Sequence, residues 1–248
     1  MGRTIRQHYV PKSYLKRFSF DGKKIYAFII KKDIPTSLDL NILKNYKKEI
    51  SISDVCLAKD FYTIDENNSS NNFGMKSMAL EKDFFQDYAE PKLSSIIEEF
   101  DNLAEKILVN KIPISSVRLT ERHQFDLALC TFIQYHRTPR IKKKFEDINN
   151  LIKHVIKENH KSKTDNPNNE IKGLDLAFTH ADKTFLNPSL WKIFLNKINS
   201  YCLLLRVSAN GNFFTSDNPV VIRKENSGGG KDIFNVNFLM MTSWFFIL

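Results

Sequence analysis

The feature that most constrains the fold is an unbroken block of helical periodicity, from about residue 75 to residue 158, with strand-like sequence on both sides. Inside the block, apolar residues such as Leu93, Ile97 and Phe100 recur at intervals of three and four, the period of a helix that buries one face. Helices that are grouped, rather than alternating with strands, are typical of an α+β fold. We therefore expect a central, mostly antiparallel sheet of N- and C-terminal strands, with the helical block packed beside it.

Strand patterns of β-branched and aromatic residues define this expected sheet. Its members are Lys24–Lys32, Tyr201–Val207, Phe213–Thr215 and Val220–Arg223, with a hairpin turn at Asn210–Gly211. Both faces of the Lys24–Lys32 segment are apolar, which predicts a strand covered on both sides. A further strand pair is expected around residues 49–52 and 61–64.

The length of 248 residues suits one domain with a sizeable core. We expect a single α+β domain over residues 1–248, with the helical insertion at about 75–158. Residues 159–172 are polar and contain Pro167, which predicts a flexible loop.

Two helices dominate the second half of the block. The first is expected over Arg118–Thr138, with Phe125, Leu129 and Phe132 buried. It has Ser115, Ser116 and Thr120 as candidate N-caps, and it must bend or end before Pro139, which cannot donate a backbone hydrogen bond. The second helix is expected from Arg140 to Glu158. Its predicted buried seam consists of Ile141, Phe145, Ile148, Ile152 and Val155.

The net charge is +9, and it is concentrated in particular segments. Residues 1–50 hold twelve Lys/Arg and four Asp/Glu, and residues 136–163 hold nine and three. Such basic segments permit a polyanionic partner, and the same charges could instead pack near the acidic segment 77–105. If nucleic acid or a nucleotide is the partner, we expect Arg140, Lys142, Lys143 and Lys144 to contact it.

The chain carries no sign of secretion or of a membrane span. Its first residues are polar, no apolar segment follows them, and the apolar run 238–248 is too short to cross a bilayer. Cys56, Cys130 and Cys202 are an odd number without the spacing of metal ligands or of a disulfide framework. We expect buried thiols in a cytoplasmic protein with no membrane partner, while the oligomeric state is left open.

Several separated blocks resemble one bacterial family, the domain of unknown function number 4238. These blocks are the residues His8-Tyr9-Val10-Pro11 with Tyr14, Leu15 and Phe18, then Asp60-Phe61-Tyr62, Gln134 with Arg137-Thr138-Pro139, and Thr215-Ser216-Asp217-Asn218-Pro219-Val220. The resemblance implies an α+β domain in a bacterial cytoplasmic or phage-related setting, and it implies no established activity. The segment 238–243 departs from the family pattern, so we expect a C-terminally truncated member.

Three of these blocks place a polar residue beside a conformational constraint, as a preorganised site requires. His8 lies near Pro11, Gln134 and Arg137 lie near Pro139, and Asp217 precedes Asn218-Pro219. We expect the four side chains of His8, Gln134, Arg137 and Asp217 to converge and to form the catalytic site. The imidazole would act as a general acid or base, and the guanidinium would hold a phosphate or a carboxylate.

An imidazole, an amide, a guanidinium and a carboxylate together suit hydrolysis of a phosphodiester, with or without Mg²⁺ held by Asp60, Glu81 and Asp217. The leading hypothesis is therefore a nuclease or phosphodiesterase, such as a defence or toxin effector. Two alternatives stay open: a non-catalytic module that binds nucleic acid or a nucleotide, and a protein-interaction domain. In the last case Arg137 and Asp217 would form a structural salt bridge. The histidines His154, His160 and His180 are expected at the surface.

Overall fold

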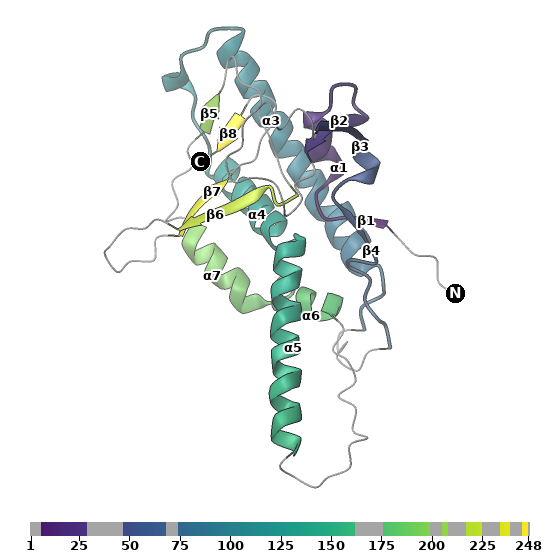
Figure 1. Cartoon of the computed structure of the whole chain (residues 1–248). Helices are drawn as coiled ribbons and strands as arrows, with labels where there is room; N and C mark the ends of the chain where they lie inside the picture. The colour runs from purple at the N-terminus through teal and green to yellow at the C-terminus, as the bar shows by residue number, and fades with distance from the viewer. Residues whose placement is uncertain are drawn as a thin grey trace.

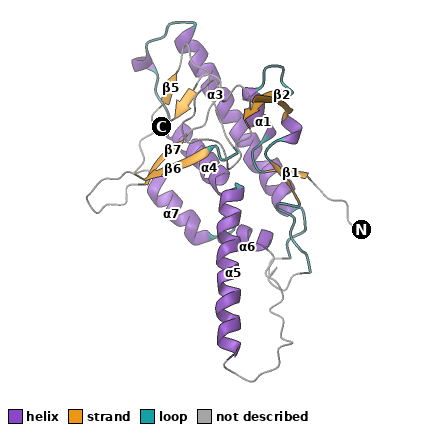
Figure 2. Ribbon diagram, viewed as in Figure 1, coloured by secondary structure: helices purple, strands orange, loops and turns teal. Residues whose placement is uncertain are grey.

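The computed structural model describes residues 6–28, 47–67, 74–161, 176–198, 205–207, 217–224, 234–238 and 245–247. Helices make up most of it, and the strands form short pairs around them (Figure 2). The helices are α1 (Lys12–Leu15), η1 (Lys16–Phe18), η2 (Ile52–Asp54), η3 (Leu80–Ala89), α3 (Glu90–Leu108), η4 (Ile114–Ser116), α4 (Glu121–His136), α5 (Pro139–Lys161), α6 (Leu176–Lys183) and α7 (Pro188–Ile198). The strands are β1 (Arg6–His8), β2 (Lys24–Phe28), β3 (Lys47–Ser51), β4 (Leu57–Lys59), β5 (Leu205–Val207), β6 (Val220–Lys224), β7 (Phe234–Phe238) and β8 (Phe245–Ile247).

The fold class is α+β with antiparallel pairing, as the sequence predicts. The expectation of one central sheet is wrong for the strands that are described, because these form four separate pairs, β1–β4, β2–β3, β5–β8 and β6–β7. Strands of three to five residues are short, and here the interior is built mainly by helices. The predicted segments 29–32, 201–204 and 213–215 and the turn at 210–211 lie outside the described residues.

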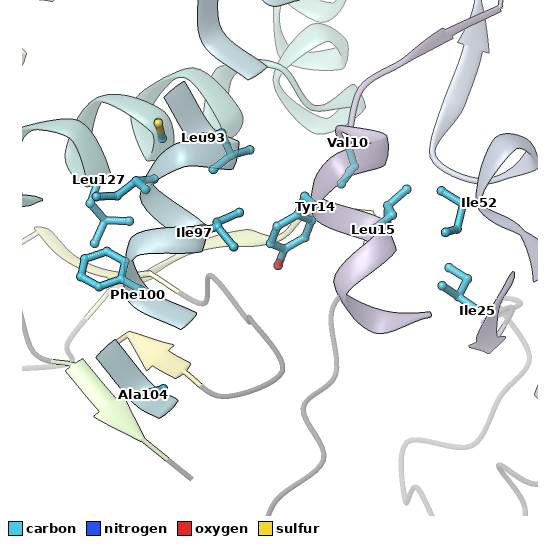
Figure 3. Close-up of a cluster of buried hydrophobic side chains, with 12 residues drawn as sticks. Val10, Tyr14, Leu15, Ile25, Ile52, Leu93, Ile97, Phe100, Ala104 and Leu127 are labelled. Carbon is cyan, nitrogen blue, oxygen red and sulfur yellow. The ribbon is translucent and has the colours of Figure 1, made fainter. Parts of the chain in front are cut away.

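Helices α1 and α3 share the first hydrophobic cluster (Figure 3). In Figure 3, Tyr14 and Leu15 of α1 lie between Ile97 of α3 on one side and Ile25 of β2 with Ile52 of η2 on the other. The periodicity of α3 is confirmed: Leu93, Ile96, Ile97, Phe100 and Ala104 are all buried. This packing fixes the N-terminal segment against the helical block.

A second cluster lies between α4, α6 and the segment that follows β4. Phe61, Tyr62 and Ile64 contribute buried side chains to it, but the expected strand over residues 61–64 is not formed, because this segment is turn and irregular backbone. Phe85 enters the cluster from η3, a ten-residue π-helix that runs directly into α3. π-helical segments are rare and frequently accompany functional or constrained sites.

Helix α4 begins where capping chemistry predicts. The Thr120 side chain accepts a hydrogen bond from the backbone N–H of His123, and Nδ1 of His123 accepts one from the backbone N–H of Thr120, which completes a capping box. Leu129 is buried, as expected, and Phe132 is partly buried. The prediction for Phe125 is wrong, since its side chain is 40% exposed.

Helix α5 projects away from the body of the molecule (Figure 1). Ile141, at its start, is buried, but the expected buried seam does not continue. Ile148, Ile152 and Val155 are 51%, 43% and 49% exposed, so the face of α5 that carries them is not covered. The helix extends to Lys161, so residues 159–161 of the predicted loop are helical, and residues 162–172 lie outside the described part. No helix in the described ranges has the length and apolar character needed to cross a bilayer.

Candidate functional site

Arg137 is the centre of the candidate site, and its side chain is only 1% exposed. Its Nη1 lies 2.8 Å from Oε1 of Glu90, and its Nη2 lies 4.0 Å from Oε2 of Glu81. Nη2 also donates a 2.7 Å hydrogen bond to the backbone carbonyl of His8. The guanidinium carbon lies 4.2 Å from the centre of the Phe85 ring, a cation–π distance. The charge of Arg137 is therefore balanced and enclosed by the protein itself.

The turn between α4 and α5 fixes the backbone of Arg137. Pro139 has no N–H to donate, and the hydroxyl of Thr138 donates instead to the carbonyl of Tyr135, at 3.0 Å. The carbonyl of Arg137 accepts a hydrogen bond from the hydroxyl of Tyr62. Tyr62 is fully buried, and burial raises the pKa of its phenol, so this donor stays protonated. The hydrogen bonds of Thr138 and Tyr62 thus fix the backbone around Arg137, where α4 ends.

The N-terminal block meets this turn through its backbone. Gln134 donates from Nε2 to the carbonyl of Tyr9 at 2.9 Å, one residue along from the carbonyl of His8 that Arg137 holds. The His8 ring points elsewhere, with Nε2 3.3 Å from the carbonyl oxygen of Ile52. Burial, with a smaller contribution from the charge of Lys12, lowers the pKa of His8. Burial therefore favours the uncharged form of this imidazole.

The second sequence block completes the same network. Gln7, which is fully buried, accepts through Oε1 a 2.6 Å hydrogen bond from the backbone N–H of Tyr62. The ammonium group of Lys142 donates to the carbonyl of Phe61 and lies 4.2 Å from the centre of its ring. The first three blocks of the sequence therefore join at one place, through hydrogen bonds between distant segments.

Asp217 lies near this network but does not join Arg137. Its residue is exposed. The pKa values of Tyr9 and Cys56 are both raised to about 12, mainly by burial and with a smaller contribution from the nearby charge of Asp217. The carboxylate thus lies on the side of Tyr9 and Cys56. The alternative of a structural salt bridge between Arg137 and Asp217 is not the pairing found, because the acidic partners of Arg137 are Glu90 and Glu81.

The predicted nucleic-acid residues at the start of α5 fall into two groups. Arg140 and Lys144 are exposed. Lys143 is also exposed, but its ammonium lies 2.9 Å from a carboxylate oxygen of Asp147 and 3.4 Å from one of Glu146. The ammonium group of Lys142 donates to the carbonyl of Phe61. Only Arg140 and Lys144 of the four therefore present a side chain to solvent without a recorded acidic partner in the described residues.

The enclosed space beside Arg137 is small. A pocket lined by Pro11, Glu90, Gln134 and Arg137, together with apolar side chains, is about the size of one water molecule. Within the described residues, no group of three or more His, Cys, Asp or Glu side chains could hold a metal ion. The proposed Mg²⁺ ligands Asp60, Glu81 and Asp217 therefore do not gather into a site.

Sequence reasoning missed the acidic partners of Arg137 and one buried histidine. Glu90 precedes Pro91 at the start of α3, where a carboxylate normally faces solvent and the helix dipole, so nothing local marks its role. Glu81 lies on the π-helix, whose altered period removes the helical spacing signal. His180 was expected at the surface but is 1% exposed, and its Nε2 donates to the carbonyl of His136 at 2.7 Å.

One comparison with known proteins gives a match. The family model described as "Protein of unknown function (DUF4238)" matches residues 6–243, nearly the whole chain. No curated protein and no solved structure matches the chain significantly. The match spans all four sequence blocks.

Proposed function

Because the chain belongs to the DUF4238 family, a membership that brings no activity with it, we propose from its geometry that it is a non-catalytic nucleic-acid-binding module. The observation that carries this proposal is that Arg137 is buried and already paired with groups of the protein. The guanidinium that would hold a phosphate already binds Glu90 and the carbonyl of His8, and it is 1% exposed. A phosphate could reach it only by breaking a buried ion pair, which costs several kcal/mol (about 3–5).

The charge of the chain supports binding at the surface. The net charge is +9, and Arg140 and Lys144 are exposed at the start of the projecting helix α5. Surface cations bind nucleic-acid phosphates by releasing condensed counterions, and this needs no pocket. The water-sized space beside Arg137 agrees with a surface mode of binding.

The test is the affinity for labelled oligonucleotides, measured by fluorescence anisotropy at 50 and 200 mM salt. We expect a Kd that weakens steeply as salt rises, and a further loss of affinity in the double variant Arg140→Ala/Lys144→Ala. The salt slope should fall by about one for each phosphate contact removed. Lys143→Ala is the matched control, because its ammonium group lies near two carboxylates, Asp147 and Glu146, so this group of three side chains has no net positive charge to offer a phosphate. Absence of binding at 50 mM salt, weaker than about 10⁻⁴ M, would refute the proposal.

Phosphodiester hydrolysis is the second candidate, and one observation favours it. The lowered pKa of His8 leaves an uncharged imidazole that can accept a proton from an attacking water or hydroxyl group. In this candidate His8 is the catalytic residue, while Gln134 and Arg137 are positioning residues that hold its backbone and that of Tyr9. Asp217 is an exposed carboxylate whose charge acts on Tyr9, the residue after His8.

This candidate is tested by incubating RNA and DNA with the protein, with and without Mg²⁺. Cleavage by the wild type that is lost in His8→Ala, while circular dichroism shows a folded variant, would support hydrolysis. Cleavage that persists in His8→Ala would assign it to another group or to a contaminant. If RNA and DNA stay intact in every reaction, the result would contradict hydrolysis and favour the non-catalytic module.

A further inference from the structure

The turn that precedes β2 is held by hydrogen bonds to the Asp21 side chain and between backbone groups. Oδ1 of Asp21 accepts hydrogen bonds from the N–H groups of Lys23 at 2.8 Å and Lys24 at 2.6 Å. The N–H of Phe20 donates to the carbonyl of Lys24 at 3.3 Å. Gly22 has φ +75°, a conformation that glycine adopts without strain. The side chain of Phe20 is therefore presented from a fixed position.

Two large aromatic rings are stacked on this turn and left in solvent. The ring centres of Phe20 and Tyr26 lie 4.7 Å apart, with 23° between the ring planes. Their residues are 51% and 46% exposed. The ammonium group of Lys47, on the neighbouring strand β3, lies 3.5 Å from the centre of the Tyr26 ring. Both groups cannot occupy one face of Tyr26 at these distances, so Lys47 covers the face opposite Phe20.

A cluster of exposed lysines surrounds the stacked pair. Residues 16–28 and 47–51 contain six Lys/Arg and two Asp/Glu, a net charge of +4. The exposed lysines are Lys16, Lys23, Lys24, Lys47 and Lys48. The Cε of Lys16 lies next to Gly22, 3.5 Å from where a Cβ would stand. One of these lysines, Lys24, lies 3.8 Å from Glu49, and both side chains are half exposed, a pairing worth little in water.

We propose that this aromatic–lysine face, formed by Phe20, Tyr26 and the five lysines around them, binds single-stranded nucleic acid. A base would stack on the exposed ring of Phe20, and the lysines would contact the adjacent phosphates. Aromatic stacking with flanking cations is the general mode of single-strand binding. In a duplex each base is stacked between its neighbours, so no base face is free to stack on the Phe20 ring. The proposal rests on the nucleic-acid-binding function above, and it adds to the surface on α5 a second surface that is specific for single strands.

The test compares three labelled ligands of equal length: single-stranded RNA, single-stranded DNA and a DNA duplex. We expect the wild type to bind both single strands more tightly than the duplex. Phe20→Ala should weaken single-strand binding by about 5- to 150-fold, the equivalent of one lost stacking contact, and leave duplex binding unchanged. Phe20→Trp, which keeps an aromatic face, should restore it. A preference for RNA over DNA would add a 2′-hydroxyl contact to the same face.

Phe125→Ala is the matched control, because Phe125 on α4 is 40% exposed and lies outside the aromatic–lysine face. Equal single-strand affinity for Phe20→Ala and the wild type, with both folded by circular dichroism, would overturn the inference while the proposed function stands. Binding of no nucleic acid by the wild type would overturn both. Loss of single-strand affinity in Phe125→Ala as well would assign the binding to a different surface.

Discussion

The guanidinium of Arg137 donates a 2.7 Å hydrogen bond to the backbone carbonyl of His8, across 129 residues of sequence. The same guanidinium is paired with Glu90, so a helix end, a helix start and the N-terminal strand meet at one side chain. This relationship gives the Gln134–Pro139 block a structural role in the described part of the chain. It also makes the stability of the protein depend on a few identifiable groups.

Replacing Arg137 should destabilise the fold severely. Arg137→Ala leaves the partly buried carboxylates of Glu90 and Glu81 without their cation, and breaking a buried pair in this way costs about 3–5 kcal/mol. Arg137→Lys should also lose stability, since one ammonium group cannot reproduce the fork that reaches Glu90 and His8 together. Urea denaturation measures both losses. The control Arg140→Ala removes an exposed neighbour and should stay within about 0.5 kcal/mol of the wild type; near-native stability of Arg137→Ala would contradict this account.

The two carboxylates beside Arg137 should respond differently to neutralisation. Burial raises the pKa of Glu81, against the opposing charge of Arg137. A raised pKa means that the folded state favours the protonated form, so the stability that Glu81 contributes is lost as the pH rises through its folded pKa. Glu81→Gln, which stays neutral, should therefore cost under about 1 kcal/mol and flatten the decline of stability at rising pH.

Glu90→Gln is the matched comparison for this prediction. Its Oε1 lies 2.8 Å from Nη1 of Arg137, and losing a charged hydrogen bond costs about 1.5–3 kcal/mol. The free energies of unfolding of Glu81→Gln and Glu90→Gln, measured from pH 4 to pH 8, test this difference. A larger loss in Glu81→Gln than in Glu90→Gln would reverse the assigned roles.

His180 should make the protein sensitive to mild acid. Burial lowers the pKa of His180 from 6.5 to about 4, so the unfolded chain takes up a proton at a higher pH than the folded chain does. The associated stability is present above pH 6.5 and is lost as the pH falls toward 4, by at most about 3 kcal/mol. His180→Gln should flatten this part of the curve of unfolding free energy against pH. An unchanged slope between pH 6.5 and 4 in the variant would contradict the assignment.

Truncation to alanine should reduce the free energy of unfolding by very different amounts at Leu129 and at Phe125, which both lie on α4. Leu129 is 3% exposed, and truncating a buried leucine to alanine typically costs about 2–5 kcal/mol. Phe125 is 40% exposed, and Phe125→Ala should cost about 1 kcal/mol or less. Thermal and urea unfolding of the two variants measure the difference. Equal costs would mean that α4 presents a different face to the core.

Local chemistry allowed much of the helical structure to be predicted from the sequence. The apolar period of α3, the Thr120 cap of α4 and the break before Pro139 all depend on residues within one or two turns of each other. Hydrogen bonds of the i to i−4 type, capping and the geometry of proline act over that range. The α+β class followed from the same patterns, because grouped helices and flanking strands can be read from local periodicity.

The tertiary structure alone decided which of these surfaces became interior. The apolar pattern of α5 predicted a buried seam, yet Ile148, Ile152 and Val155 remain exposed, because burial requires a partner element and periodicity does not supply one. Likewise Arg137 could be recognised as a constrained polar residue, but its partners Glu90, Glu81 and the carbonyl of His8 come from distant segments. Such partners are selected by the packing that buries most apolar surface, a property of the whole chain that no local pattern contains.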